Sequence, residues 1–203
     1  MLKIKKIDAD WNEIKNECRS TINKDATEKE PSKEFIIKLL ISEHSPIRLA
    51  TIKWRWEGIK SWVSVHFARH WLGWDKWVST QRIDRTGIDR NKSPQDTLVN
   101  MDVKANAQAL INVSRWRLCY HASPETRKEM EKLKKAIRNA GQEEIALCMQ
   151  PNCVYRGGCP EMKSCGYWDK IQSEARKRYV ENLFDIECRY IIADKIFYEM
   201  VEE

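Results

Sequence analysis

The segment LATIKWRWEG, residues 49–58, alternates apolar and polar side chains with a period of two. Ile52, Trp54 and Trp56 fall on one face of a strand and the intervening cationic residues fall on the other, because successive strand side chains point to opposite sides. Tryptophans on a shared strand face are typical of a core. We therefore predict a strand of the central sheet here, ended by Gly58.

The pattern around this strand predicts further elements. A short strand is expected at 2–5, and helices are expected after the Ser32 cap, from Ile59 to Phe67, over 106–117, and from Ser123-Pro124 to Asn139. The polar stretch 71–94 is predicted as loop or extended chain, and the Cys- and glycine-rich stretch 148–168 is predicted as a loop. Two amphipathic patterns end the chain: Ile171, Ala175, Tyr179 and Leu183, then Ala193, Ile196, Phe197 and Met200.

Early strands and late helices predict an α/β (α+β) fold with a mixed central sheet flanked by helices and a helical C-terminal part. The length of 203 residues favours one domain spanning 1–203. This domain would include a Cys-rich loop at 148–168 and C-terminal helices at 169–203.

The composition argues against a disordered chain and against a membrane-spanning protein. Hydrophobic residues make up 42% and charged residues 33%, which is typical of a globular chain. No stretch approaches the roughly 20 apolar residues of a membrane span, and the first residues carry no apolar leader. Seven cysteines without a secretion signal predict reduced thiols and a cytoplasmic protein. The net charge of +6 favours an anionic partner, and the mixing of charges favours a local phosphate site over a nucleic-acid tail.

The segment FARHWLGWDKWVSTQR, residues 67–82, combines three tryptophans with two arginines and a histidine. Tryptophans are typical of a protein core, whereas arginines are typical of a solvent-exposed loop. The mixture predicts a pocket that accepts flat rings and binds an anion. Arginine is well suited to binding phosphate because its planar guanidinium group donates two hydrogen bonds at once and stays charged. The candidate arginines in and near this stretch are Arg69, Arg82, Arg85, Arg90 and Arg117. Any one of them could instead pair with nearby aspartates.

The order of these residues resembles the flavin-dependent thymidylate synthases, the ThyX family, whose signature is Arg-His-Arg, seven residues, then Ser-x-Arg. Arg69-His70 and Ser79 fit the signature, and Arg82 closes it one position late. The flanking matches, which extend the resemblance over residues 17–117, are Cys18 to Thr21, His44-Ser45-Pro46, Arg90 to Pro94, Asn106, Asn112 and Arg117.

The resemblance implies an enzyme that reductively methylates dUMP to dTMP as a homotetramer with shared active sites. Methylenetetrahydrofolate would donate the carbon, FAD would carry the hydride and NADPH would be the reductant. Residues implied for dUMP are His66, Arg69, Ser79, Arg82, Arg90 and Arg117. Residues implied for FAD are Thr21, Ser45, Arg69, His70, Asn106 and Asn112. Arg117 would act catalytically, stabilising negative charge that develops on the uracil ring. No cysteine nucleophile is implied, and Cys119 is expected to be buried.

Helical spacing supports part of this assignment. Asn106 and Arg117 are separated by three turns and should share one helix face. Asn112 lies off that face and should reach another part of the ligands or another subunit.

Three departures concern the flavin. Arg48 stands where the family has Glu, and Trp71 and Gln108 stand where it has Arg. The flavin would have to sit differently, for example stacked on Trp71. A pyrimidine nucleotide hydroxymethylase of the same fold is therefore an alternative.

Four cysteines lie within CMQPNCVYRGGCPEMKSC, and they suggest a metal site made by Cys148, Cys153, Cys159 and Cys165. A structural zinc or an iron–sulfur cluster would fit four thiolates, although the gaps exceed the usual C-x2-C spacing. Unrelated thiols in a glycine-rich loop are the other interpretation. A metal-clipped module that binds nucleic acid through the arginines is the alternative from a different functional class.

Overall fold

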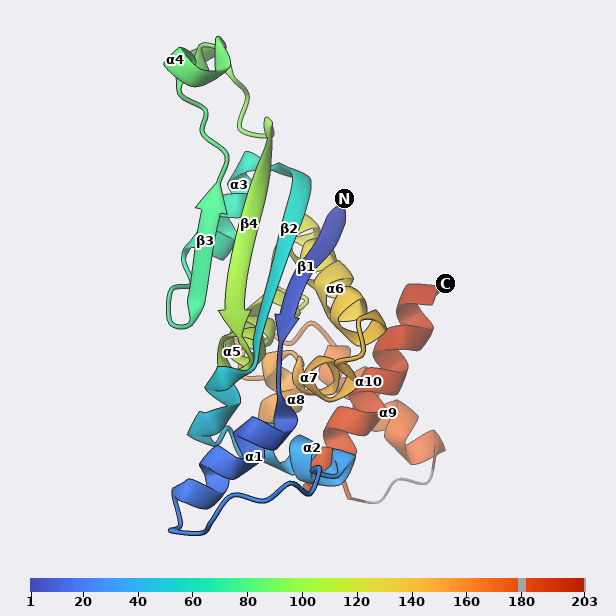
Figure 1. Cartoon of the computed structure of the whole chain (residues 1–203). Coiled ribbons are helices and arrows are strands. Elements are labelled where there is room, and N and C mark those ends of the chain that lie inside the picture. The colour runs from blue at the N-terminus through green and yellow to red at the C-terminus, as the bar shows by residue number, and fades with distance from the viewer. Residues whose placement is uncertain (179–181, 203) are drawn as a thin grey trace.

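The computed structural model describes residues 1–178 and 182–202 (Figure 1). Four antiparallel strands form a sheet in the order β1-β2-β4-β3. The strands are β1 (Leu2–Asp8), β2 (Thr51–Lys60), β3 (Trp74–Val78) and β4 (Leu98–Asn106). The helices are α1 (Trp11–Ser20), α2 (Lys33–Ile41), α3 (Ser61–Ala68), α4 (Ile83–Thr86), α5 (Ala107–Arg117), α6 (Pro124–Asn139), α7 (Glu143–Cys148), α8 (Asn152–Arg156), α9 (Tyr167–Lys177) and α10 (Ile186–Glu202), with short 3-10 turns η1 (Ser45–Leu49) and η2 (Arg90–Lys92).

Strand β2 lies inside the sheet as its alternation predicts. Ile52, Trp54 and Trp56 are fully buried. The two tryptophan rings meet edge to face at 5.4 Å, and Trp54 meets Trp74 of β3 at 5.1 Å. Gly58 does not end the strand, contrary to the prediction. Its φ of +65° accompanies a register shift between Trp56 and Ile59, so it forms a bulge and pairing resumes beyond it.

The stretch at 71–94, predicted as loop or extended chain, contains one strand and two short helical segments. Strand β3 begins at Trp74, whose ring is buried against Phe67, and the following segment contains α4 and η2. Strand β4 was not predicted. It separates β2 from β3, and its alternating Val99, Met101 and Val103 are buried. Pairing with distant strands stabilises both segments, and local composition does not report it.

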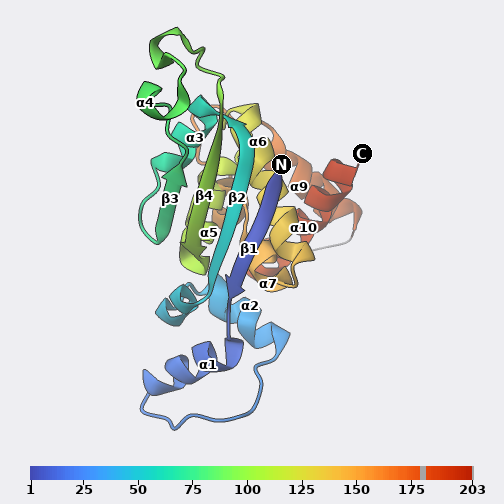
Figure 2. The same cartoon turned by 45° about the horizontal axis from the view of Figure 1, so that its top comes forward.

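Helices cover one face of the sheet and leave the other open. In Figures 1 and 2, α3, α5 and α6 lie behind the strands, and α7 to α10 extend this helical layer. The open face carries ion pairs such as Arg55 with Asp102 at 2.7 Å. The predicted α+β class is therefore confirmed, with a sheet that is antiparallel throughout. Across residues 1–178 and 182–202, no helix is long and apolar enough to cross a membrane.

The predicted C-terminal patterns largely correspond to α9 and α10. Ile171 and Ala175 of α9 and Ala193 and Ile196 of α10 are buried. Tyr179 of the first pattern lies outside the described residues. The prediction of a loop at 148–168 is wrong in part, because this stretch contains α8. That helix ends at Gly157, which has a φ of +70°.

Gly73, in the turn before β3, should tolerate no larger residue. It has a φ of +66°, and a Cβ there would lie 2.4 Å from the Asn106 side chain. Gly73→Ala is expected to lower the free energy of unfolding by about 2–3 kcal/mol, from left-handed strain plus this overlap. Gly141→Ala is the matched control, since Gly141 has a φ of +82° but open space around it, and it should cost about 1 kcal/mol. Urea unfolding measures both, and equal losses would contradict the overlap.

Candidate active site

Two polar side chains, Arg117 and His70, meet a backbone carbonyl where α3 and α5 end. Arg117, in the last turn of α5, donates from Nε to His70 Nε2 at 2.9 Å and from Nη2 to the His66 carbonyl at 2.8 Å. His70 follows α3 directly, and His66 lies in the last turn of that helix. These two hydrogen bonds fix the guanidinium of Arg117 between the two helices.

The described residues do not neutralise the positive charge at this place. Burial, and then the charge of Arg69, lower the pKa of Arg117. Burial together with Arg117 and Lys76 lowers the pKa of His70 to about 4, so its ring is neutral at pH 7. In the part of the chain that the structure describes, neither Arg69 nor Arg117 forms an ion pair with a carboxylate. Two neighbouring guanidinium groups without a counterion are suited to binding an anion.

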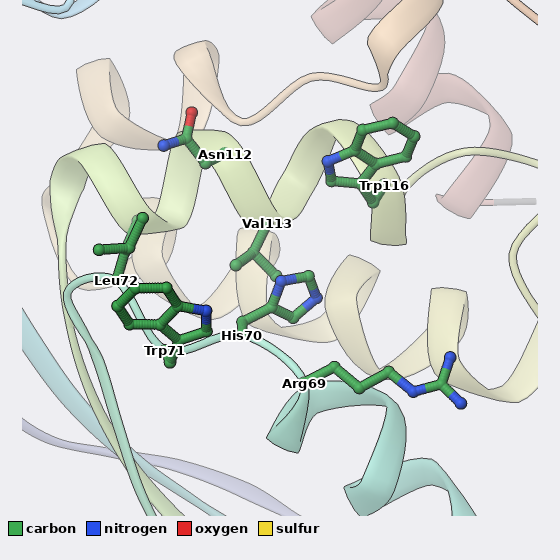
Figure 3. A pocket seen from close by; sticks show the side chains of 8 residues that line it. Arg69, His70, Trp71, Leu72, Asn112, Val113 and Trp116 are labelled. Atoms are coloured by element: carbon green, nitrogen blue, oxygen red, sulfur yellow. The ribbon is translucent and has the colours of Figure 1, made fainter.

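A hollow of about 160 Å³ opens beside this pair. Figure 3 shows Arg69, His70, Trp71 and Leu72 along one side, and Asn112, Val113 and Trp116 of α5 along the other. Trp71 is 72% exposed and Trp116 is 56% exposed. Flat apolar surface next to cationic groups matches the pocket predicted from residues 67–82. The hollow is smaller than the roughly 300–1,000 Å³ typical of ligand pockets, so one chain does not enclose a nucleotide here.

The other predicted nucleotide residues line a second cavity. Ser79, Arg82 and Arg90 contribute to an open cavity of about 470 Å³ formed by the segment between β3 and β4. Figures 1 and 2 show that this segment, which contains α4, projects beyond the end of the sheet. Arg82 pairs with Asp84 at 2.8 Å. This agrees with the alternative interpretation, in which the arginines pair with nearby aspartates. Among the described residues, Arg90 forms no ion pair with a carboxylate.

The two groups lie at opposite ends of β3. Arg69 to Leu72 precede this strand and Ser79 follows it, so about 17 Å of extended backbone lies between them. The two cavities share no lining residue. Within one chain, Arg69 and Arg117 come together as predicted, whereas Arg90 lies elsewhere.

The residues implied for FAD are distributed differently from the expectation. Asn106 does not line the hollow. It caps α5 by accepting from the Ala109 backbone at 2.9 Å, with Gly73 packed over it. Asn112 lines the hollow although it was expected to lie off the shared face. Thr21 and Ser45 are exposed and belong to neither cavity. His66 faces Thr126 at 2.9 Å, away from both cavities.

A network that the sequence did not indicate holds Asn112. Glu43 pairs with Arg115, and its other carboxylate oxygen accepts from Gln108 at 2.5 Å. Arg115 also donates to Asn112 Oδ1 at 3.0 Å. Glu43 has a φ of +52°, an unfavourable backbone for glutamate. Gln108, one of the three departures, therefore joins a network inside the chain, while Arg48 and Trp71 remain exposed. Nothing in the sequence marks Glu43, because its partners lie more than sixty residues away.

The predicted metal set needs a correction. Cys148 is buried in the core, where burial raises its pKa and Lys134 lies nearby, and it does not join Cys153, Cys159 and Cys165. Within the described ranges, no three side chains of His, Cys, Asp or Glu are arranged around a single ion.

The lowered pKa of His70 predicts a pH dependence of stability. Its folded pKa of about 4 lies below the unfolded value of 6.5. As pH falls below 6.5, His70 binds a proton in the unfolded chain but not in the folded chain. The free energy of unfolding therefore decreases between pH 6.5 and 4. Because the ring is only half-buried, we expect a loss on the order of 1 kcal/mol. His70→Gln keeps an acceptor for Arg117 but cannot titrate. Urea unfolding at pH 7 and 4.5 should show a larger drop for the natural protein than for this variant. An equal drop would mean that His70 titrates normally.

Comparison with solved structures identifies the fold. The UMP/dUMP methylase PolB from Streptomyces cacaoi, solved with 5-Br dUMP, matches with a TM-score of 0.59 and 15% identity over 75% of this chain and 96% of its own. Thymidylate synthase X from Helicobacter pylori, solved with FAD and dUMP, matches with a TM-score of 0.61 and 12% identity over 73% and 99%. A second structure of that enzyme with FAD and dUMP gives 0.57 and 13% over 72% and 98%. No protein-family model and no curated protein sequence matches the chain. The chain therefore has the ThyX fold, as the resemblance implied.

Proposed function

We propose that this protein methylates dUMP to dTMP, with methylenetetrahydrofolate as carbon donor, FAD as hydride carrier and NADPH as reductant. The observation that carries the proposal is the fixed position of Arg117 at His70, next to Arg69, where neither arginine forms an ion pair with a described carboxylate. The ThyX fold and the order of motif residues support it. The folate and NADPH rest on the family resemblance alone.

In this proposal, Arg117 faces the uracil ring. Its guanidinium is held by His70 and His66, so it needs no reorganisation when negative charge develops on the pyrimidine. His70 contributes as a neutral acceptor that orients Arg117. Arg90, Ser79 and Arg82 bind the phosphate, with Arg82 exchanging Asp84 for the ligand, and Arg69 lies between ring and phosphate.

Two partial cavities favour a site shared between subunits. One cavity is lined by Arg69 and by His70, the partner of Arg117, and is too small for a nucleotide, and the other is lined by Arg90 on a projecting segment. Neither cavity contains all the residues that are proposed to bind dUMP. We propose that the chain forms a homotetramer in which the projecting segment of one subunit reaches the hollow of another.

The residues at the hollow fit a flavin in part. Trp71 and Trp116 offer flat, exposed surfaces for an aromatic ring, and Arg69 and His70 supply polar contacts. Asn112, held by Arg115, presents its amide at the same place. When bound, a reduced flavin would supply the hydride. Asn106 would contribute its remaining amide group, and Thr21 and Ser45 would do so only from a neighbouring subunit or at the far end of the cofactor.

Subunit mixing tests the shared site. Arg90→Ala and Arg117→Ala are each expected to lower dTMP formation sharply, so that either variant assembled alone is nearly inactive. Co-expression of the two variants should restore activity to about a quarter of the natural level, because random assembly leaves that share of sites with both arginines. Mixed subunits that stay inactive, although they assemble, would contradict a site that draws these arginines from different chains.

Product analysis tests the reaction itself. Incubation with dUMP, methylenetetrahydrofolate, FAD and NADPH should give a nucleotide heavier by one methylene unit, measured by mass spectrometry. A product with an added hydroxymethyl group would support the hydroxymethylase, which the altered positions Trp71 and Gln108 leave as the second candidate. A colourless, inactive protein that shifts DNA in a salt-dependent way would replace both with nucleic-acid binding.

A further inference from the structure

Four cysteines from two distant segments gather beyond the end of α5. Cys119 lies in the turn that follows α5, Cys153 lies in α8, and Cys159 and Cys165 lie in the connection from α8 to α9. All four are free thiols. Sequence spacing alone grouped the last three with Cys148, because Cys119 is more than thirty residues away from them.

Contacts on both sides hold the two segments together. His121 lies next to the Lys163 carbonyl at 2.8 Å, and the rings of Tyr120 and Tyr167 stack at 4.7 Å. These contacts join the turn after Cys119 to the residues that flank Cys165. The turn and the Cys-rich connection are therefore packed against each other.

Helix α8 is fixed to α5 in the same region. The Arg115 guanidinium lies over the Tyr155 ring at 3.6 Å. The Cys153 carbonyl accepts from the Gly158 backbone at 2.9 Å, and this bond turns the chain back so that Cys159 returns toward Cys153. Cys153 is buried and Cys159 is packed against the core, whereas Cys165 is exposed.

The thiols are close enough to influence one another. Burial raises the pKa of Cys153 to about 12, and the charges of Cys119, Cys165 and Cys159 add to this rise. The pKa of Cys119 is raised by burial, and Cys165, Glu161 and Cys159 add to it. This mutual influence agrees with the packing of the two segments, which places the four cysteines in one region.

We propose that Cys119, Cys153, Cys159 and Cys165 hold a [4Fe–4S] cluster. A single zinc ion would bring four sulfurs to within about 3.8 Å of one another, and the described residues show no such arrangement. A cubane bonds each thiolate to its own iron, so its ligands stand farther apart and need no closely spaced pair. The cluster would tie the connection from α8 to α9 to the end of α5, two residues beyond Arg117.

Anaerobic purification and metal analysis test the proposal. The full-length protein, reconstituted with ferrous iron and sulfide, should contain about four iron and four sulfide ions per chain. Dithionite should reduce the cluster and produce an electron paramagnetic resonance signal of a reduced cubane, which a flavin does not give. Zinc bound at about one ion per chain, or iron that remains below about one per chain, would overturn the proposal.

Two matched variants identify the ligands. Cys119→Ser should lower iron content at least several-fold, whereas Cys148→Ser, a buried thiol outside the set, should leave it unchanged. Iron retained in Cys119→Ser and lost in Cys148→Ser would overturn the assignment. Circular dichroism establishes that each variant is folded, and the iron and sulfide content of the natural protein decides the question if a variant fails to fold.

Discussion

Replacement of Arg117 by Ala is expected to lower kcat for dTMP formation by about 10²- to 10³-fold, the effect of removing a fixed donor that faces developing charge. The guanidinium is positioned before substrate binds, by hydrogen bonds of 2.9 Å to His70 and 2.8 Å to the His66 carbonyl. Its loss removes stabilisation of the transition state, so kcat should change more than KM for dUMP.

Arg117→Lys separates charge from geometry. Lysine keeps the positive charge but cannot donate to His70 and to the His66 carbonyl in the same fixed orientation. We expect it to recover only part of the activity. Arg85→Ala is the control, because Arg85 lies in α4, is exposed and interacts with Asp84 at 3.7 Å. Its kcat should match that of the natural protein. An Arg117→Ala enzyme with unchanged kcat would remove Arg117 from the reaction.

The central strand could be predicted because its signal is local. The alternation around Trp54 and Trp56 marks which face of β2 is buried, and both rings are fully buried. Strand β4, and the pairing of β3 in the sheet, could not be predicted for the opposite reason. Trp74 is buried by Phe67 and by pairing with Ala105, and these partners are not evident from the residues around it. Strand formation depends on cross-strand neighbours far away in sequence.

The same distinction applies to the candidate site. Arg69, His70 and Arg117 could be grouped because the motif fixes their order, and they lie close together in the structure. The division of the arginines between two cavities was visible only in three dimensions, since β3 lies between them. The link between Glu43 and Arg115 joins residues 72 positions apart, and no sequence pattern connects them. Cys119 was expected to be buried and unremarkable, but it is only partly buried and lies with the other thiols.

The second large effect concerns stability and lies away from the site. Asp194 of α10 is the counterion of Lys134, whose side chain is 1% exposed, with Nζ 2.7 Å from Oδ1. Arg138 reaches the other carboxylate oxygen at 3.0 Å. Asp194→Asn keeps the shape but leaves Lys134 buried without an anion. The free energy of unfolding should fall by about 3–5 kcal/mol, the usual result of removing one partner of a buried pair.

Glu199→Gln provides the matched control on the same helix. Glu199 pairs with Arg178 at 2.7 Å, but both side chains are substantially exposed, so its loss should cost no more than about 1 kcal/mol. The double variant Lys134→Met and Asp194→Leu should regain most of the stability, because an apolar pair carries no desolvation penalty. Urea unfolding of the natural protein and the three variants measures these differences. If Asp194→Asn loses no more than Glu199→Gln, water or a shifted proton already compensates Lys134, and the ion pair between α6 and α10 is not what holds these helices together.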